Sequence, residues 1–246
     1  MEQITSRKNR IVSHLRLLAQ DSSYRTERGE FLCDGLKMLR EAESSGAEVT
    51  LVLWKEGGAA GETGCMQQYT APADLFDSVS PLKNSPGPLF TVREPQPDSS
   101  VIVNALVLEN VQDPGNVGTV IRTADAFSIG AVVLLGACAD PFSPKTVRAT
   151  MGAVFRQRIL RMGTDAFEQW RRQNRLKLYG AVLSEEATEI RKVDISHAAV
   201  AVGNEGNGLS RTLTEMCDGR IMIPMFGGES LNAAVAASIL MWEMIR

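Results

Sequence analysis

Apolar runs alternate with helix-spaced segments along the second half of the chain. The apolar run Val101–Leu108 is typical of a strand buried on both faces of a parallel sheet. The next segment, Asn116–Phe127, has helical spacing. Further strands are expected at Ala131–Leu135, Val154–Leu160, Leu176–Val182, Ala198–Val202 and Arg220–Ile223, and a final apolar helix at Ser230–Arg246. This alternation predicts a doubly wound α/β fold with a parallel sheet.

The first 93 residues predict a smaller α/β unit. The segments Ile4–Ala19 and Phe31–Ser44 favour helices. A strand at Val49–Trp54, a short helix near Ala73–Val79 and a strand near Leu89–Val92 complete this unit.

A polar segment with two prolines separates these two parts. Pro95 and Pro97 cannot continue a helix or a central strand, so residues 94–100 favour a linker. We therefore expect a first domain at 1–95, a linker at 96–100 and a second domain at 101–246.

The composition is that of a soluble globular protein. Of its 246 residues, 44% are hydrophobic and 22% are charged. No uninterrupted apolar stretch reaches the length of a membrane span, and the N-terminus lacks the apolar core of a signal peptide. We expect a cytoplasmic protein without membrane contact.

The charge is balanced overall but uneven along the chain. A formal net charge of −3 argues against coating nucleic acid by bulk charge. Residues 1–28 are rich in arginine, and residues 145–177 carry nine Lys or Arg against two acidic residues. Together these stretches fit a side that faces nucleic acid, although either one alone is more typical of a solvated helix face.

The cysteines and histidines match no metal or disulfide pattern. Four cysteines are scattered without paired spacing, and His14 and His197 lie far apart. We expect no metal site and no disulfide framework, with the cysteines acting as small buried residues.

Three loops rich in glycine, asparagine and serine each follow an apolar run. In the first, Pro114 and Gly115 favour a turn and Asn116 can cap the next helix. Arg122 lies nearly two helical turns further on and can grip a phosphate through two parallel hydrogen bonds. The alternative is a surface arginine that pairs with Asp125 or Glu109.

The second loop spans Gly203–Gly208 and lets the backbone approach a ligand closely. Its glycines fall as G-x-x-G-x-G, which is not the dinucleotide fingerprint, so an oxidoreductase is disfavoured. Glu205 either accepts a hydrogen bond from a ribose hydroxyl or shapes the loop.

The third loop, Phe226–Asn232, leads into an alanine-rich helix. Ser230 is a good N-cap residue, and capping alone is one interpretation of it. Asn232 is expected one turn inside the helix, where asparagine is a mediocre helix former, which indicates a side-chain role. Three such loops at strand ends can converge on one site.

Taken in order, the segments 110–124, 202–210 and 223–232 resemble those of the SpoU (TrmH-type) branch of the SPOUT RNA methyltransferases. The segment 143–152 is similar to that family's connecting segment. Residues 24–32 and 80–89 are similar to the ribosomal-protein-like substrate-binding domain that precedes many such enzymes. The loop between Ile223 and Ser230 is about a residue shorter than in some relatives.

The resemblance implies methylation of a ribose 2′-hydroxyl in RNA with S-adenosylmethionine, a deep trefoil knot and a homodimer that uses the final helix. It assigns active-site roles to Asn116, Arg122, Glu205, Ser230 and Asn232. It assigns cofactor contacts to Gly203, Ile223 and Leu231, with Asn204 and Met225 beside them. The basic stretches add RNA-binding candidates: Arg7, Lys8, Arg10, Arg25, Lys145 and Arg148.

The expected substrate is 23S ribosomal RNA. The alternatives are a transfer-RNA 2′-O-methyltransferase and an RNA-binding or ribosome-assembly factor that has lost catalysis. For Arg122, a general base and a cationic clamp are both open. The clamp is physically easier because a guanidinium stays protonated to about pH 12 or above.

Overall fold

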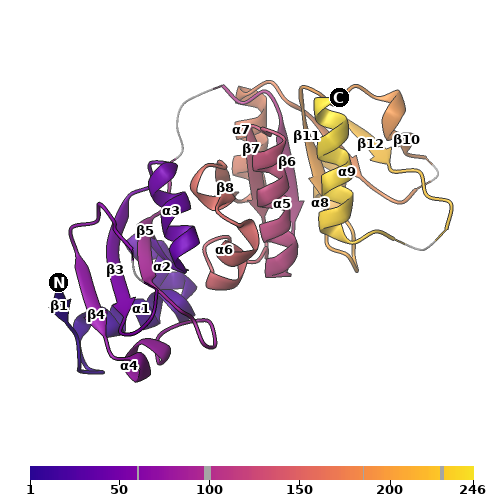
Figure 1. Cartoon of the computed structure of the whole chain (residues 1–246). Coiled ribbons are helices and arrows are strands. Elements are labelled where there is room, and N and C mark those ends of the chain that lie inside the picture. The colour runs from indigo at the N-terminus through magenta and orange to yellow at the C-terminus, as the bar shows by residue number, and fades with distance from the viewer. Residues whose placement is uncertain (60, 97–100, 185, 228–229) are drawn as a thin grey trace. The chain divides into compact units, whose positions relative to one another are not determined.

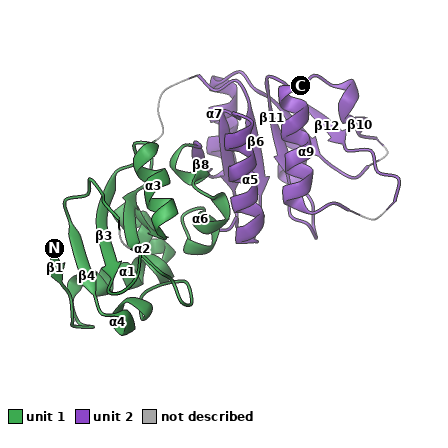
Figure 2. Cartoon of the chain, viewed as in Figure 1, with its two compact units in different colours: residues 1–96, 140–156 green, residues 97–139, 157–246 purple. Residues whose placement is uncertain are grey.

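The computed structural model describes residues 1–59, 61–96, 101–184, 186–227 and 230–246. The chain forms two compact units (Figure 2). Unit 1 comprises Met1–Gln96 and Asp140–Arg156, and unit 2 comprises Pro97–Ala139 and Gln157–Arg246. Apart from Gln96, the expected linker lies outside the described residues.

Unit 1 is built on a mixed sheet with the strand order β1-β4-β3-β5-β2 (Figure 1). Strand β5 pairs antiparallel with both β2 and β3, whereas β4 pairs parallel with β1 and β3. The strands are β1 (Glu2–Gln3), β2 (Glu30–Asp34), β3 (Val49–Lys55), β4 (Gln68–Ala71) and β5 (Leu89–Arg93). The helices are α1 (Arg10–Gln20), α2 (Ser22–Arg28), α3 (Leu36–Ser44), α4 (Ala73–Asp77), α6 (Pro144–Thr150) and the 3-10 helix η1 (Ala153–Phe155).

The helix expected over Phe31–Ser44 is wrong in its first part. Residues 30–34 form strand β2, and only Leu36–Ser44 is helical. Gly29, at φ 57°, ends α2, and Gly35, at φ 104°, separates the strand from α3. A short apolar run fits a strand or a helix equally well, and pairing with β5 decides for the strand.

Residues 140–156, expected in the second domain, pack on unit 1 instead. The Arg25 guanidinium donates from Nε and Nη2 to one Asp140 carboxylate oxygen, at 2.8 and 2.6 Å. The Phe31 ring lies 5.0 Å from that of Phe142 and 6.2 Å from that of Phe155, between centroids. Arg25 is only 4% exposed, so it ties this segment down and does not offer its charge to RNA as expected.

Unit 2 contains an all-parallel sheet with the order β10-β12-β9-β11-β6-β7-β8, which confirms the predicted α/β fold with a parallel sheet. Its strands are β6 (Ala105–Glu109), β7 (Ala131–Leu135), β8 (Ile159–Met162), β9 (Lys177–Ala181), β10 (Thr188–Glu189), β11 (Ala198–Val202) and β12 (Gly219–Met222). Its helices are α5 (Pro114–Ala126), α7 (Thr164–Gln173), the 3-10 helix η2 (Ile190–Lys192), α8 (Arg211–Met216) and α9 (Ala233–Ile245). The strand expected at Val154–Leu160 therefore begins only at Ile159, after η1.

Helices cover both faces of this sheet. Val107, Val133 and Ala201 form a buried cluster with Phe167 of α7 and Leu213 of α8. Helices α5 and α9 pack side by side on the other face (Figure 1). The helix after β6 and the helix after β11 thus lie on opposite faces, although the two strands are neighbours.

The four cysteines carry free thiols. Burial raises the pKa of Cys33, and burial raises the pKa of Cys217 to about 11, so neither thiol is ionised at neutral pH. None of the described helices is long and apolar enough to cross a membrane.

A series of polar contacts links α1, α2 and β2 of unit 1. The imidazole of His14 contacts the Tyr24 hydroxyl at 3.0 Å through Nδ1 and a Glu30 carboxylate oxygen at 3.2 Å through Nε2. Thr50 also donates to Glu30, which is 8% exposed. Burial raises the pKa of Glu30, but hydrogen bonds from His14, Thr50 and Thr91 more than offset this, and the pKa falls to about 2.

We expect Glu30 to make unit 1 less stable at low pH. The carboxyl titrates at about 2 in the folded unit, against a reference value of 4.5. Its ionised form therefore stabilises the fold above pH 4.5, and this stabilisation is lost as the pH falls toward 2. In urea unfolding from pH 7 to pH 2, Glu30→Gln should be less stable at pH 7 and lose less stability on acidification. Glu48→Gln, at an exposed carboxylate, is the control; identical pH profiles for all three proteins would contradict the assignment.

Candidate active site

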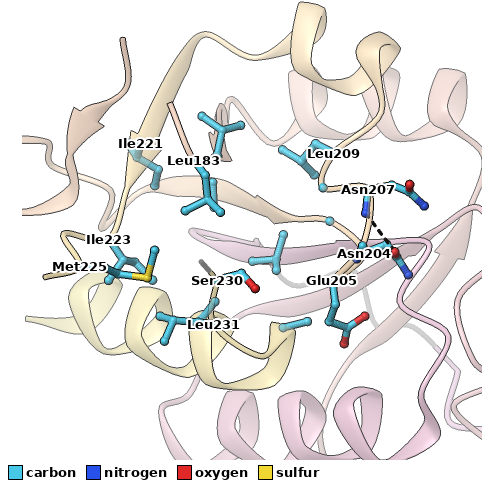
Figure 3. A pocket seen from close by; sticks show the side chains of 18 residues that line it. Leu183, Asn204, Glu205, Asn207, Leu209, Ile221, Ile223, Met225, Ser230 and Leu231 are labelled. Carbon is cyan, nitrogen blue, oxygen red and sulfur yellow. Dashed lines mark hydrogen bonds between the residues drawn. The ribbon is translucent and has the colours of Figure 1, made fainter. Parts of the chain in front are cut away.

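The site lies where strands of unit 2 end. Because the strands are parallel, the loops after β9, β11 and β12 meet at one edge of the sheet. They line a cavity of about 410 Å³. Figure 3 shows Ile223 and Met225 on one side of this cavity, Asn204 and Glu205 on the other, and Ser230 between them.

The five residues predicted to contact a cofactor all line this cavity: Gly203, Asn204, Ile223, Met225 and Leu231. Sequence reasoning missed the contribution of residues 181–183, which comprise the last residue of β9 and the two residues after it. That strand was expected, but its position beside β11 is a non-local pairing that no local pattern contains.

The Gly203–Gly208 loop folds back on itself. The Gly208 amide donates to the Asn204 carbonyl at 2.8 Å, and Gly208 has φ 66°. The Asn204 side chain accepts from the amides of Gly206 and Asn207, at 2.9 and 3.3 Å. A Cβ atom on Gly203 would lie 2.1 Å from the Gly208 carbonyl carbon, so this position requires glycine.

Asn116 joins the three loops. Its amide nitrogen donates to Glu205 at 2.5 Å, and its amide oxygen accepts from the Asn232 side chain at 3.0 Å. Asn116 was expected to cap α5, but Asp113 does so, accepting from the Asn116 backbone amide at 2.8 Å. The Asn116 side chain is thereby left for the network.

Asn232, not Ser230, is the N-cap of α9. Its side-chain oxygen accepts from the amides of Ala234 and Val235, at 2.9 and 3.3 Å. Helix α9 starts at Ala233, so the expected start at Ser230 is wrong. Serine and asparagine both cap helices well, and here Asn232 is distinguished by its hydrogen bond to Asn116. Ser230 is exposed and lines the cavity, whereas Gly228 and Glu229 lie outside the described residues.

Arg122 is exposed on α5 and makes no hydrogen bond or ion pair with the described residues. The structure therefore gives no support to a pairing with Asp125 or Glu109. The Glu109 carboxylate, which is 5% exposed, accepts from the backbone amide and the hydroxyl of Ser210, both at 2.7 Å. Sequence reasoning missed this bond, for which the one signal is a carboxylate at the end of an apolar strand.

No cluster of three or more His, Cys, Asp or Glu side chains suited to a metal ion occurs among the described residues.

Comparison with known proteins identifies the family. The model of the SpoU rRNA Methylase family matches residues 104–242. The chain belongs to the SpoU rRNA methylase family. This confirms the resemblance found in its three motifs.

A curated relative matches nearly the full length of the chain. It is the 23S rRNA (guanosine(2553)-2′-O)-methyltransferase RlmP of Bacillus subtilis, 34% identical over 248 residues, with 99% of each chain covered.

Solved structures of methyltransferases match nearly the whole chain. An rRNA methyltransferase from Sinorhizobium meliloti superposes with a TM-score of 0.85 at 28% identity, covering 99% of this chain and 96% of that one. The SpoU methyltransferase AviRb from Streptomyces viridochromogenes, in complex with AdoMet, gives a TM-score of 0.88 at 25% identity, covering 97% of each chain.

We expect Gly203→Ala to destabilise the loop that lines the cavity. The added methyl group would overlap the Gly208 backbone, and such overpacking typically costs about 1–3 kcal/mol. Gly206→Ala, in the same loop, is the matched control, because its new methyl group would meet only the Asn204 side-chain oxygen at 3.4 Å. Thermal unfolding and hydrogen exchange at the Gly208 amide measure the difference. Equal stability and exchange in the two variants would show that the close approach is unimportant.

Proposed function

We propose that this protein transfers a methyl group from S-adenosylmethionine to a ribose 2′-hydroxyl of 23S ribosomal RNA, in the cytoplasm. The observation that carries the proposal is the Asn116 network, which joins the three family motifs through hydrogen bonds that end at Glu205, a residue that lines the cavity. A full-length relative named as a 23S rRNA 2′-O-methyltransferase supports the choice of RNA.

The cavity suits the cofactor. Its volume of about 410 Å³ lies within the range of small-molecule sites. Apolar side chains such as Leu183, Ile223 and Leu231 can contact an adenosyl group, and the close turn at Gly203 leaves backbone groups near it. When bound, the cofactor supplies an electrophilic methyl group.

The protein's own task is to place the ribose oxygen and stabilise the charge that it develops. Orientation of reacting groups can lower a barrier by about 7–11 kcal/mol. Asn116, which accepts a hydrogen bond from Asn232, donates to one oxygen of Glu205, so Glu205 and the exposed hydroxyl of Ser230 can hydrogen-bond the ribose at fixed positions.

Arg122 acts as a cationic clamp in this proposal. Its guanidinium has no anionic partner among the described residues, so it is available for a phosphate of the RNA. A guanidinium that stays protonated up to about pH 12 stabilises a developing alkoxide more readily than it accepts a proton.

Unit 1 is proposed to bind the RNA. Arg7, Lys8 and Arg10 are exposed near its N-terminus, and Lys145 and Arg148 are exposed on α6. Since α6 belongs to unit 1, basic residues from distant parts of the sequence contribute to the surface of one unit. The trefoil knot implied by the family resemblance is also part of this proposal. It is supported by the strand order β6-β11-β9-β12 and by the cavity that the loops after β9, β11 and β12 line together.

We propose that the protein acts as a homodimer through α9. Val235, Trp242 and Ile245 are 48%, 53% and 44% exposed on this helix, and the Trp242 ring lies 5.8 Å from that of Phe127, the C-cap residue of α5. An apolar face of this kind favours burial against a second copy. Light scattering at micromolar concentration should give a dimer, and Trp242→Glu should shift it to monomer, whereas Val103→Glu should not. A monomeric parent protein contradicts this proposal.

The activity is tested by transfer of labelled methyl groups to unmodified ribosomal RNA, large ribosomal subunits and transfer RNA in parallel. We expect 2′-O-methyl nucleotides in the 23S rRNA, free or within the subunit. Label in transfer RNA alone would overturn the assignment of 23S rRNA as the substrate. Cofactor binding without transfer to any RNA would favour an RNA-binding or assembly factor.

Arg122→Ala should lower kcat by about 100-fold or more, because it removes a group that stabilises charge in the transition state. Arg172→Ala is the control, as this arginine is 74% exposed and pairs with Glu168 on α7. If Arg122 is a clamp, the residual activity of the Arg122→Ala variant should depend on pH in the same way as the activity of the parent protein. Near-full turnover of the Arg122 variant would show that it is neither clamp nor base.

A further inference from the structure

A second hollow lies beside the cavity, at the ends of β6 and β11. It has a volume of about 350 Å³ and is lined by residues from the loops after these two strands. Apart from Gly208 and Leu209, every lining residue carries an amide or a hydroxyl group, and none carries a charge. We call it the carboxamide hollow; its amide groups belong to Asn110, Gln112, Asn204 and Asn207.

The topology of the sheet creates this hollow. Neighbouring strands β6 and β11 continue into α5 and α8, which lie on opposite faces. The two connections diverge there and leave a crevice at the carboxyl edge of the sheet. In parallel α/β sheets this crevice is the usual position of a ligand.

Two of the four carboxamides are engaged by the protein itself. The Asn204 side chain donates to the Asn110 carbonyl at 3.2 Å and accepts from two amides of its own loop. The Asn110 side-chain oxygen accepts from the Ala137 amide at 2.8 Å. These bonds fix the walls of the hollow.

The other two carboxamides are available. Gln112 and Asn207 are exposed, and neither side chain makes a hydrogen bond to the described residues. Each offers two donors and an acceptor without a charge. A phosphate would call for a cation, and the lining contains none. The complementary ligand is a flat, neutral group with paired donors and acceptors, which describes the edge of a nucleobase.

The hollow and the cofactor cavity share one loop. Asn204, Asn207, Gly208 and Leu209 line both, so ligands in the two sites contact the same short stretch of backbone. We propose that the carboxamide hollow receives the base of the nucleotide whose ribose is methylated, and that Gln112 and Asn207 hydrogen-bond its edge. This inference rests on the proposed function, and it adds residues that select the nucleotide.

The test uses an RNA fragment that carries the nucleotide methylated by the parent protein. A second fragment has an abasic site there, with the ribose and its 2′-hydroxyl retained. Gln112→Ala and Asn207→Ala should each lower kcat/KM on the intact fragment by about 10-fold to 100-fold. The Kd of the cofactor should be unchanged in Gln112→Ala, because Gln112 lines the carboxamide hollow and not the cofactor cavity. On the abasic fragment Gln112→Ala should match the parent protein, because the group that Gln112 binds is missing. Gln173→Ala, at an exposed carboxamide near the end of α7, is the control and should match the parent on both fragments.

The outcomes separate this inference from the proposed function. A parent protein that methylates no RNA overturns the proposed function. An active parent protein with unaffected Gln112 and Asn207 variants overturns the inference alone. Equal losses on intact and abasic RNA also overturn it, because they would show that these side chains act on the loop and not on a base.

Discussion

The parallel pairing of every strand in the sheet of unit 2 is the constraint on which the site depends. Parallel strands bring their carboxyl ends to the same edge, so β6 and β11, whose last residues are Glu109 and Val202, end beside one another. Glu109 at the end of β6 can therefore accept two hydrogen bonds from Ser210, which starts the helix after β11. A buried carboxylate with two donors holds two neighbouring strand ends together in a low-dielectric setting. The cavity and the carboxamide hollow both depend on this arrangement, since each lies against the loop between β11 and α8.

Unit 1 depends on a different interaction, which the sequence order conceals. The segment 140–156 lies between strands of the other sheet in the sequence but packs on unit 1. Its anchor is the pair Arg25–Asp140, in which the guanidinium also donates to the Leu18 carbonyl at 2.6 Å. Removal of one partner from such a buried pair typically costs about 3–5 kcal/mol, because the other charge stays desolvated. The basic helix α6 is therefore held on unit 1 by an arginine that itself lacks access to RNA.

Local patterns predicted the elements whose signals are local. Strands β7 and β11 are uninterrupted apolar runs and were expected within their observed bounds. The three motif loops were expected because glycine, proline and asparagine have few roles other than turns and caps. The pattern was wrong at Phe31, where a helix was expected, and at the start of α9, where Asn232 was expected inside the helix and is its N-cap. It also contained nothing about strand order, so the place of Leu183 in the cavity required the structure.

The hydrogen bonds at the site run in one direction, and this direction explains why two asparagines are needed. Backbone amides at the start of α9 donate to the Asn232 oxygen, the Asn232 nitrogen donates to Asn116, and the Asn116 nitrogen donates to Glu205. This series of hydrogen bonds begins at the positive end of helix α9 and ends at the Glu205 carboxylate, so each bond polarises the next in a favourable sense. An aspartate at position 116 would accept from Asn232 but would have no proton to donate, and it would place two carboxylates in contact. A carboxamide can do both tasks in one side chain, which is why it can hold a charged residue at a fixed position between three loops.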